Sequence, residues 1–187
     1  MSTLLTAIIA VGGILFLLGI PMVLFYNKMV NNRAKVENSW GQINVQLKMR
    51  ADLVPNLVET VGGYATHERE TLTSVTQARN QYLNAKTADE VIRSSDAMSN
   101  VLGRLMAISE QYPQLKADQG FLNLQNQLRE LEQKIALYRQ FYNDTVLLYN
   151  RYIITFPKNI LAAVFGARQM PFFEIDHAER SAPQVRF

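Results

Sequence analysis

Apolar side chains recur at alternating spacings of three and four residues along the first third of the chain. Twelve positions between Met22 and Val61 follow this spacing, and ten of them are apolar or aromatic. Such a spacing places all twelve on one stripe of an α-helix. The pattern therefore predicts one long helix, or two nearly collinear helices. The positions are Met22, Tyr26, Met29, Arg33, Val36, Trp40, Ile43, Leu47, Arg50, Val54, Leu57 and Val61.

A second stripe of the same kind runs from Phe121 to Phe156, with ten of eleven positions apolar or aromatic. Two shorter helical patterns lie between the stripes, over residues 64–85 and 87–112. Short connections favour antiparallel neighbours. No convincing length of chain alternates with a period of two. The sequence thus predicts an all-α fold, an antiparallel four-helix bundle with two long and two shorter helices.

Local signals mark several helix ends. Thr87 and Glu90 have the spacing of a capping box, in which each side chain pairs with a free backbone amide at the helix start. Asp118 is placed to cap the helix that follows it. Gly166 is placed to end a short apolar helix after Pro157.

Pro55 lies within the first stripe, beside Val54. A proline cannot bond to the carbonyl four residues earlier, here that of Ala51, and this normally costs about 3 kcal/mol. The stripe continues beyond it through Leu57. We expect a helix kinked at Pro55, and the alternative is a break near Leu53 with a new helix beginning at Pro55.

The first 27 residues differ from the rest, because no charged side chain lies between Ser2 and Asn27. Leu4 to Tyr26 is 23 residues, which at about 1.5 Å per residue reach about 34 Å, against about 30 Å for a hydrocarbon core. A cleaved signal peptide is disfavoured, since a basic start and a cleavage site are both missing. We therefore expect a transmembrane helix over residues 1–27 that continues into a bundle over 28–157. Residues 158–187 are expected to form a short helix and a non-helical tail that docks on the bundle or on a neighbouring subunit.

The net charge is +3, and basic residues follow the apolar segment. Lys28, Arg33 and Lys35 form a basic collar, whereas the short N-terminal flank has no Lys or Arg. The positive-inside rule then places the N-terminus outside and the bundle in the cytoplasm, as in a single-pass protein of the bacterial inner membrane. The collar is expected either to contact anionic lipid headgroups or to be a solvated basic helix face.

Arg33 and Arg50 interrupt the first stripe. Three interpretations remain open: each faces a polar partner such as Glu59 or Asp144, each fixes register and oligomeric state, or each extends out of the stripe to water. The second stripe is rich in tyrosine, which fits either a core or a strip that faces a partner. We take the candidate interface to be Tyr138, Tyr142, Tyr149, Tyr152, Phe172, Phe173 and Phe187.

Candidate chemistry is sparse. The chain has no cysteine and two histidines. The segment "HERET" starts at His67, but Thr71 stands where a zinc protease has its second histidine. A site built from His67, His177 and Glu68 or Glu174 is the weakest hypothesis. Basic residues are spread out and nearly balanced by acids, which argues against nucleic acid as a partner. We therefore expect no enzymatic activity, no metal and no cofactor.

Several motifs occur together from Tyr26 to Phe187: "DLVPNLVETV", "HERETL", "YNDTVLLYN", "FPKNILAAVFG" and "PQVRF". In this combination the chain resembles the LemA family of bacterial membrane-anchored helical proteins. The resemblance implies a cytoplasmic helical bundle without an established activity, in a family often discussed alongside membrane proteases and envelope stress.

Together, these observations predict a non-enzymatic membrane-anchored scaffold that self-associates into a homo-oligomer. An adaptor or regulator of another membrane protein, such as a protease, is the alternative, and a hydrolase that uses His67 and Glu68 is a distant third.

Overall fold

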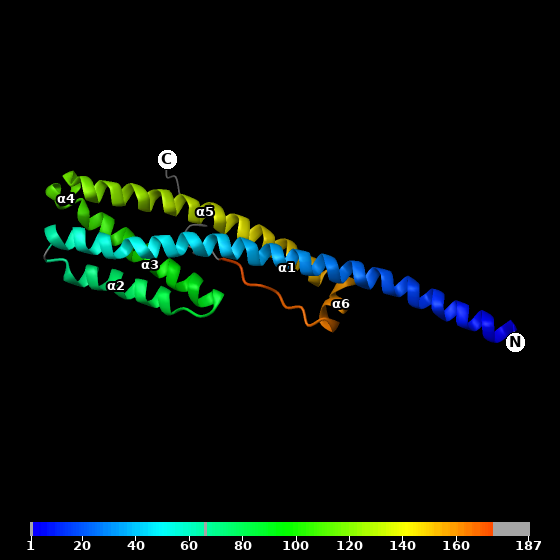
Figure 1. The fold of residues 1–187 in the computed structure, drawn as a ribbon. Coiled ribbons are helices and arrows are strands. Elements are labelled where there is room, and N and C mark those ends of the chain that lie inside the picture. Colours follow the sequence, from blue (N-terminus) through cyan, green and yellow to red (C-terminus); the bar gives the residue numbers. More distant parts are fainter. Residues whose placement is uncertain (1, 66, 174–187) are drawn as a thin grey trace, which may run out of the picture. The chain divides into compact units, whose positions relative to one another are not determined.

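The computed structural model describes residues 2–65 and 67–173, and within them every regular element is an α-helix (Figure 1). The all-helical prediction is confirmed for this part of the chain. The helices are α1 (Ser2–Tyr64), α2 (Arg69–Asn84), α3 (Ala88–Ser109), α4 (Pro113–Ala117), α5 (Gln119–Ile154) and α6 (Lys158–Val164).

The expected transmembrane helix over residues 1–27 is wrong. Among residues 2–65 and 67–173, no helix combines the length and the apolar character that a membrane crossing requires. Residues 2–27 are instead the first part of α1, a single helix of 63 residues that continues into strongly polar sequence.

The chain divides into two compact units. Unit 1 comprises Met1–Trp40 and Tyr142–Met170, and unit 2 comprises Gly41–Phe141 and Pro171–Phe187. Long helices α1 and α5 each contribute to both units. The predicted division into residues 1–27, 28–157 and 158–187 stays a prediction.

Unit 2 is a bundle of the second part of α1, the first part of α5, and α2, α3 and α4 (Figure 1). The Tyr64 hydroxyl at the end of α1 donates to Asp118 at the start of α5, at 3.0 Å, so these two helices run antiparallel.

The core of unit 2 is largely apolar, and burying one aliphatic or aromatic side chain contributes about 1.5–3 kcal/mol. The α1 stripe is buried here as predicted, and the core includes Ile43, Leu47, Val54, Leu57, Val61, Val75, Tyr82, Met98, Leu102, Leu105, Phe121, Leu128 and Ile135.

The predicted helix ends are confirmed where the structure describes them. Thr87 and Glu90 form the capping box at the start of α3. The Phe121 amide donates to Asp118 Oδ1 at 2.8 Å, which satisfies one free amide of the first turn of α5. Gly166, with φ of 66°, ends the turn after α6 in the left-handed conformation that glycine adopts without strain.

α1 passes through Pro55 without interruption, so the alternative of a new helix starting there is not observed. The Ala51 carbonyl, which Pro55 cannot pair with, accepts a hydrogen bond from Arg79 Nε of α2 at 2.9 Å. Ala51 is fully buried, and an unsatisfied carbonyl at this position would be costly. Arg79 therefore offsets part of the proline penalty. The kink angle at Pro55 stays a prediction.

Unit 1 is held together by aromatic rings. Phe25 of α1 stacks on Tyr152 of α5, with ring centroids 5.3 Å apart, and on Phe165 beside α6, at 6.3 Å. The stripe prediction placed Tyr26 inside and did not include Phe25. The structure buries Phe25 against the Tyr152 and Phe165 rings and leaves Tyr26 half-exposed, with its ring centroid 5.0 Å from that of Phe165.

Candidate functional site

A cluster of charged and hydroxyl side chains lies inside unit 2, around Arg50. Arg50 is fully buried at a stripe position of α1. Its Nη1 donates to Glu132 Oε1 of α5 at 2.7 Å and to Ser99 Oγ of α3 at 2.6 Å. Its Nη2 donates to the carbonyl and the hydroxyl of Ser95, at 2.9 and 2.8 Å. One guanidinium thereby joins three helices.

Arg139 of α5 is the second member of this arginine cluster. Its Nη2 donates to Asp96 at 2.9 Å and to Ser95 Oγ at 3.2 Å, so the Ser95 hydroxyl accepts from both arginines. The guanidinium carbon lies 4.2 Å from the centroid of the buried Phe173 ring. Burial lowers the pKa of Arg139, Asp96 raises it, and the neighbouring Arg50 charge lowers it again. Arginine still remains charged at any physiological pH.

The arginine cluster is suited to fixing helix register. Two guanidinium groups face two carboxylates, Glu132 and Asp96, and a guanidinium does not act as a general acid or base near neutral pH. Removing one partner from a buried ion pair costs far more than the intact pair contributes. The three helices that meet at Arg50 are consequently held in one relative register.

One of the three interpretations left open for Arg50 was a polar partner such as Glu59 or Asp144. The partners are Glu132, Ser95 and Ser99 instead. A signal was present in α3, where Ser95 interrupts the apolar series Val91, Met98, Leu102 and Leu105 at the three–four spacing. A polar residue on a buried stripe requires a polar partner.

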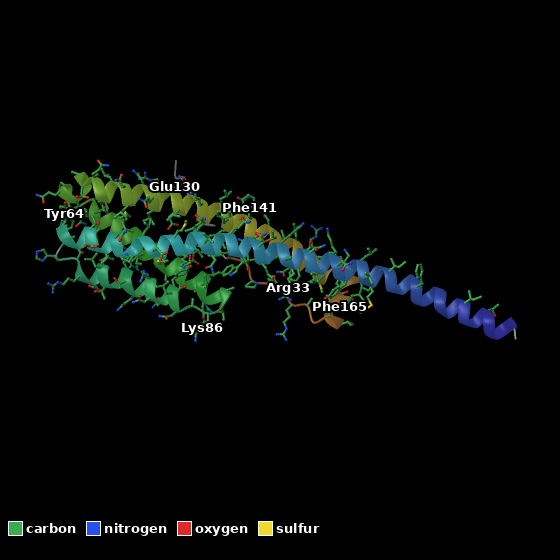
Figure 2. All side chains as sticks on the ribbon, in the orientation of Figure 1. Arg33, Tyr64, Lys86, Glu130, Phe141 and Phe165 are labelled. Atoms are coloured by element: carbon green, nitrogen blue, oxygen red, sulfur yellow. The ribbon has the colours of Figure 1, made fainter. Side chains whose placement is uncertain are left out.

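A pocket of about 380 Å³ lies in unit 1, next to the predicted basic collar. It is lined by Tyr26, Val30 and Arg33 of α1, Tyr149 of α5 and the chain from Phe165 to Met170. Figure 2 labels Arg33 and Phe165, which lie on neighbouring segments of the ribbon. Burial raises the pKa of Tyr149. The pocket lining thus combines two guanidinium groups, those of Arg33 and Arg168, with the aromatic side chains of Tyr26, Tyr149 and Phe165.

The three predicted collar residues, Lys28, Arg33 and Lys35, are all exposed. Arg33 Nε pairs with Glu37 Oε1 at 2.9 Å, four residues further along the same helix face. Of the three, Arg33 alone lines the pocket.

The residues of the predicted interface occupy different environments. Tyr142, Tyr149 and Phe173 are buried, and Tyr142 packs its ring 5.4 Å from that of Trp40. Tyr138 and Tyr152 are half-buried, and Phe172 is exposed. Phe187 lies outside the described residues. Whether any of these residues contacts a partner stays a prediction.

The tail after α6 docks on unit 1 through one amide side chain. Asn150 is buried, donates from Nδ2 to the Met170 carbonyl at 2.9 Å, and accepts from the Met170 amide at 2.8 Å. These two hydrogen bonds satisfy both backbone polar groups of Met170 and attach the chain after α6 to α5.

His67 is exposed and lies in the connection between α1 and α2, where the Glu68 carboxylate accepts from the Tyr112 hydroxyl at 3.4 Å. Within residues 2–65 and 67–173, no group of three or more His, Asp or Glu side chains is placed to hold a metal ion. His177 and Glu174 lie outside the described residues.

The model of the LemA family matches residues 39–187. The match covers well over half of the chain, including all of unit 2. The chain belongs to the LemA family. The resemblance inferred from the sequence motifs is thereby confirmed.

Relatives of this LemA-family chain include two kinds of named protein. Protein LemA of Metamycoplasma hominis is 26% identical over 157 residues, which cover 82% of this chain and 71% of that protein. Magnetosome protein MamQ 2 of Paramagnetospirillum magneticum is 23% identical, covering 80% and 64%. MamQ of Magnetospirillum gryphiswaldense is 22% identical, covering 79% and 64%. The chain thus spans less than two thirds of the magnetosome relatives, and none of these names includes an enzymatic activity.

The LemA-family match also separates the two candidate sites. Arg50, Arg139 and their partners all lie within the matched range. The pocket residues of α1, Tyr26, Met29, Val30 and Arg33, precede it, whereas Tyr149 and Phe165–Met170 lie inside it.

Proposed function

We propose that this protein is a non-enzymatic helical scaffold that self-associates at a membrane surface. The observation that carries the proposal is an apolar face on α5 within unit 2, where Leu137 and Phe141 are 50% and 51% exposed. They are four residues apart, so they lie together on one helix face. Large apolar side chains exposed side by side on a folded chain typically mark an interaction site.

Unit 1 supports the same proposal independently. Leu147 and Ile154, seven residues apart on α5, and Ile160 and Val164, four apart on α6, are all more than half exposed. Each pair extends along one face of its helix. A second copy of the chain would present the same faces, as a symmetric interface requires.

The arginine cluster supports a structural role. Its charged groups are engaged in ion pairs that hold helices in register, which favours a rigid building block. The relatives named for the magnetosome support a part in organising a larger assembly.

The membrane part of the proposal rests on the exposed apolar side chains of the first part of α1. Phe16, Ile20, Val23 and Leu24 are exposed, and no charged residue lies between Ser2 and Asn27. A helix segment of this composition is stable in contact with an apolar phase or another apolar surface.

Mass measurement tests self-association. The full chain is extracted in mild detergent, and light scattering should give a multiple of 21.3 kDa. The variant Leu137→Glu/Phe141→Glu places two carboxylates on the proposed contact and should reduce the mass toward the monomer. The matched control Gln133→Glu/Gln140→Glu adds the same charge at exposed polar positions of α5 and should leave the mass unchanged.

A wild-type monomer at high concentration would refute self-association. In-cell crosslinking then distinguishes the adaptor alternative, because an adaptor is captured with a different protein and a scaffold with copies of itself.

A further inference from the structure

Positive charge in this protein is concentrated in unit 1. Its sequence contains six basic side chains, Lys28, Arg33, Lys35, Arg151, Lys158 and Arg168, and two acidic ones, Glu37 and Asp144. Unit 1 therefore has a net charge of +4, whereas the whole chain has +3. A ligand of unit 1 is accordingly expected to be an anion.

The unit 1 pocket presents two of these cations to one space. Arg33 uses Nε in its pair with Glu37, which leaves its two terminal amino groups available to a further acceptor. Arg168 is exposed, and among residues 2–65 and 67–173 no Asp or Glu lines the pocket. Arginine pairs well with phosphate oxygens, because its planar group donates two parallel hydrogen bonds.

An apolar stripe leads away from the pocket along α1. Val30 lines the pocket, and Val23 and Phe16 precede it at intervals of seven residues, so all three lie on one side of the helix. Val23 and Phe16 are 59% and 68% exposed. From Phe16 to Val30 the stripe is about 21 Å long at about 1.5 Å per residue.

The far end of this stripe is hollowed. Phe16, Gly19, Ile20, Val23 and Leu24 line an open depression of about 390 Å³ on the surface of α1. A Cβ atom added at Gly19 would meet nothing within 4 Å, so a larger side chain could be accommodated at this lining position. The stripe therefore combines an elongated apolar surface with a cationic pocket at one end.

We infer that unit 1 binds one anionic phospholipid, with the headgroup phosphate between Arg33 and Arg168 and an acyl chain along Phe16, Val23 and Val30. An anionic headgroup complements the net charge of unit 1, and a long hydrocarbon chain matches the apolar stripe. A free phosphate ion would use the pocket alone. The inference rests on the membrane-surface part of the proposed function and is independent of self-association.

Binding of the full chain to vesicles of phosphatidylglycerol or phosphatidylcholine tests the site. Wild-type protein should prefer phosphatidylglycerol, and Arg33→Gln/Arg168→Gln should weaken that binding about tenfold or more. The control Lys28→Gln/Lys35→Gln removes the same charge from exposed positions outside the pocket and should weaken it about threefold at most. Equal losses in the two variants would overturn the site in favour of diffuse electrostatic attraction.

The apolar stripe is tested separately with Gly19→Leu. This variant fills the hollow at a helical position with open space around it, so the helix should be preserved. Native mass spectrometry should show one phosphatidylglycerol per wild-type chain and less with Gly19→Leu, while a lipid with very short chains binds both equally. Retention of long-chain lipid by Gly19→Leu would contradict the stripe.

Inorganic phosphate is the remaining probe. Displacement of the lipid by millimolar phosphate, with equal binding of phosphate alone, would identify the pocket as a phosphate site and refute the lipid assignment. Mass is measured on the same samples. Loss of lipid with an intact oligomer refutes only this inference, and a monomer that retains lipid refutes only self-association.

Discussion

Arg79 Nε of α2 lies 2.9 Å from the Ala51 carbonyl of α1, the carbonyl that Pro55 leaves without its usual helical donor. A side chain from a neighbouring helix thereby replaces the missing backbone bond. This contact explains in part how a proline is accommodated inside a 63-residue helix.

This contact predicts thermodynamic coupling between Arg79 and Pro55. Arg79→Gln should reduce the free energy of unfolding by about 1–3 kcal/mol, because it leaves a buried carbonyl unsatisfied. In a Pro55→Ala background the same change should cost less than about 1 kcal/mol, since the alanine amide can pair with that carbonyl. Urea unfolding of the four proteins measures the difference. Arg69→Gln, at an exposed position of α2, is the control. Additive effects would contradict the coupling.

The kink predicted at Pro55 is tested by the same variant. Pro55→Ala should retain the helical content and change the geometry of the assembly, because proline is the usual cause of sharp kinks in long helices. Images of the wild-type and variant assemblies that superimpose would refute a geometric role for Pro55.

Arg50 is predicted to be far more sensitive to loss than an exposed arginine. Arg50→Ala should destabilise the protein by about 3 kcal/mol, because it empties the space of a fully buried side chain and leaves Ser95, Ser99 and Glu132 without their donor. Glu132→Gln should also destabilise the protein, because it leaves the fully buried Arg50 charge without its counter-charge, although the glutamine oxygen can still accept the Arg50 hydrogen bond. Arg129→Ala, at an exposed position of α5, serves as the control in thermal unfolding. Equal effects of Arg50→Ala and Arg129→Ala would exclude a structural role for the cluster.

Two adjacent serines allow a sharper test of the arginine cluster. The Ser95 hydroxyl accepts from both arginines, whereas the Ser94 hydroxyl, also buried, donates to carbonyls of its own helix, those of Glu90 and Val91. Ser95→Ala should therefore destabilise unit 2 by about 1–3 kcal/mol, and Ser94→Ala by less than about 1 kcal/mol. Hydrogen exchange of α3 reports both changes. The opposite ranking would count against the shared acceptor.

The sequence predicted the helices and their caps because these features depend on local periodicity and on residues three or four apart. Thr87 with Glu90, and Asp118 with Phe121, are pairs of this kind. The partner of Arg50 could not be predicted in the same way, because Glu132 is 82 residues away and becomes adjacent only when α1 and α5 pack. The unit 1 pocket depends on the path of the chain after α6, for which the sequence carried no periodic signal.

The apolar segment over residues 1–27 misled the sequence reasoning for a different reason. The apolar composition and the absence of charge predicted a membrane crossing. Composition alone does not distinguish a membrane-spanning helix from an apolar helix segment that contacts another apolar surface. The predicted stripe also misplaced one aromatic residue. It included Tyr26, whereas the structure buries Phe25, the preceding residue, against the Tyr152 ring. Spacing alone did not distinguish these two neighbours.

Acid should weaken unit 2 partly through Asp118. The Phe121 amide and then the Tyr64 hydroxyl donate to this carboxylate and hold its pKa below the ordinary 3.8. The unfolded chain therefore binds more protons in this range, and the contribution of Asp118 is lost as the pH falls through its folded pKa. Asp118→Asn keeps a capping residue and removes the titration, so its stability should fall less between about pH 5 and pH 2. A curve parallel to that of the wild type would contradict this assignment.

The attachment of the tail depends on both ends of the Asn150 amide. Asn150→Asp removes the donor to the Met170 carbonyl and places a carboxylate beside it, so exchange of the amides of residues 168–170 should accelerate at least about tenfold. Gln169→Glu adds a comparable charge at an exposed tail position and should have little effect. Unchanged exchange in Asn150→Asp would show that other contacts hold the tail.

The Arg79 contact also constrains the order in which this chain could acquire or lose substitutions. While Pro55 is present, a lineage that replaces Arg79 passes through a less stable intermediate, whereas one that first replaces Pro55 does not. Across descendants, a proline here without an arginine opposite should therefore be rarer than an arginine without the proline. Reconstructed ancestors would reveal which came first.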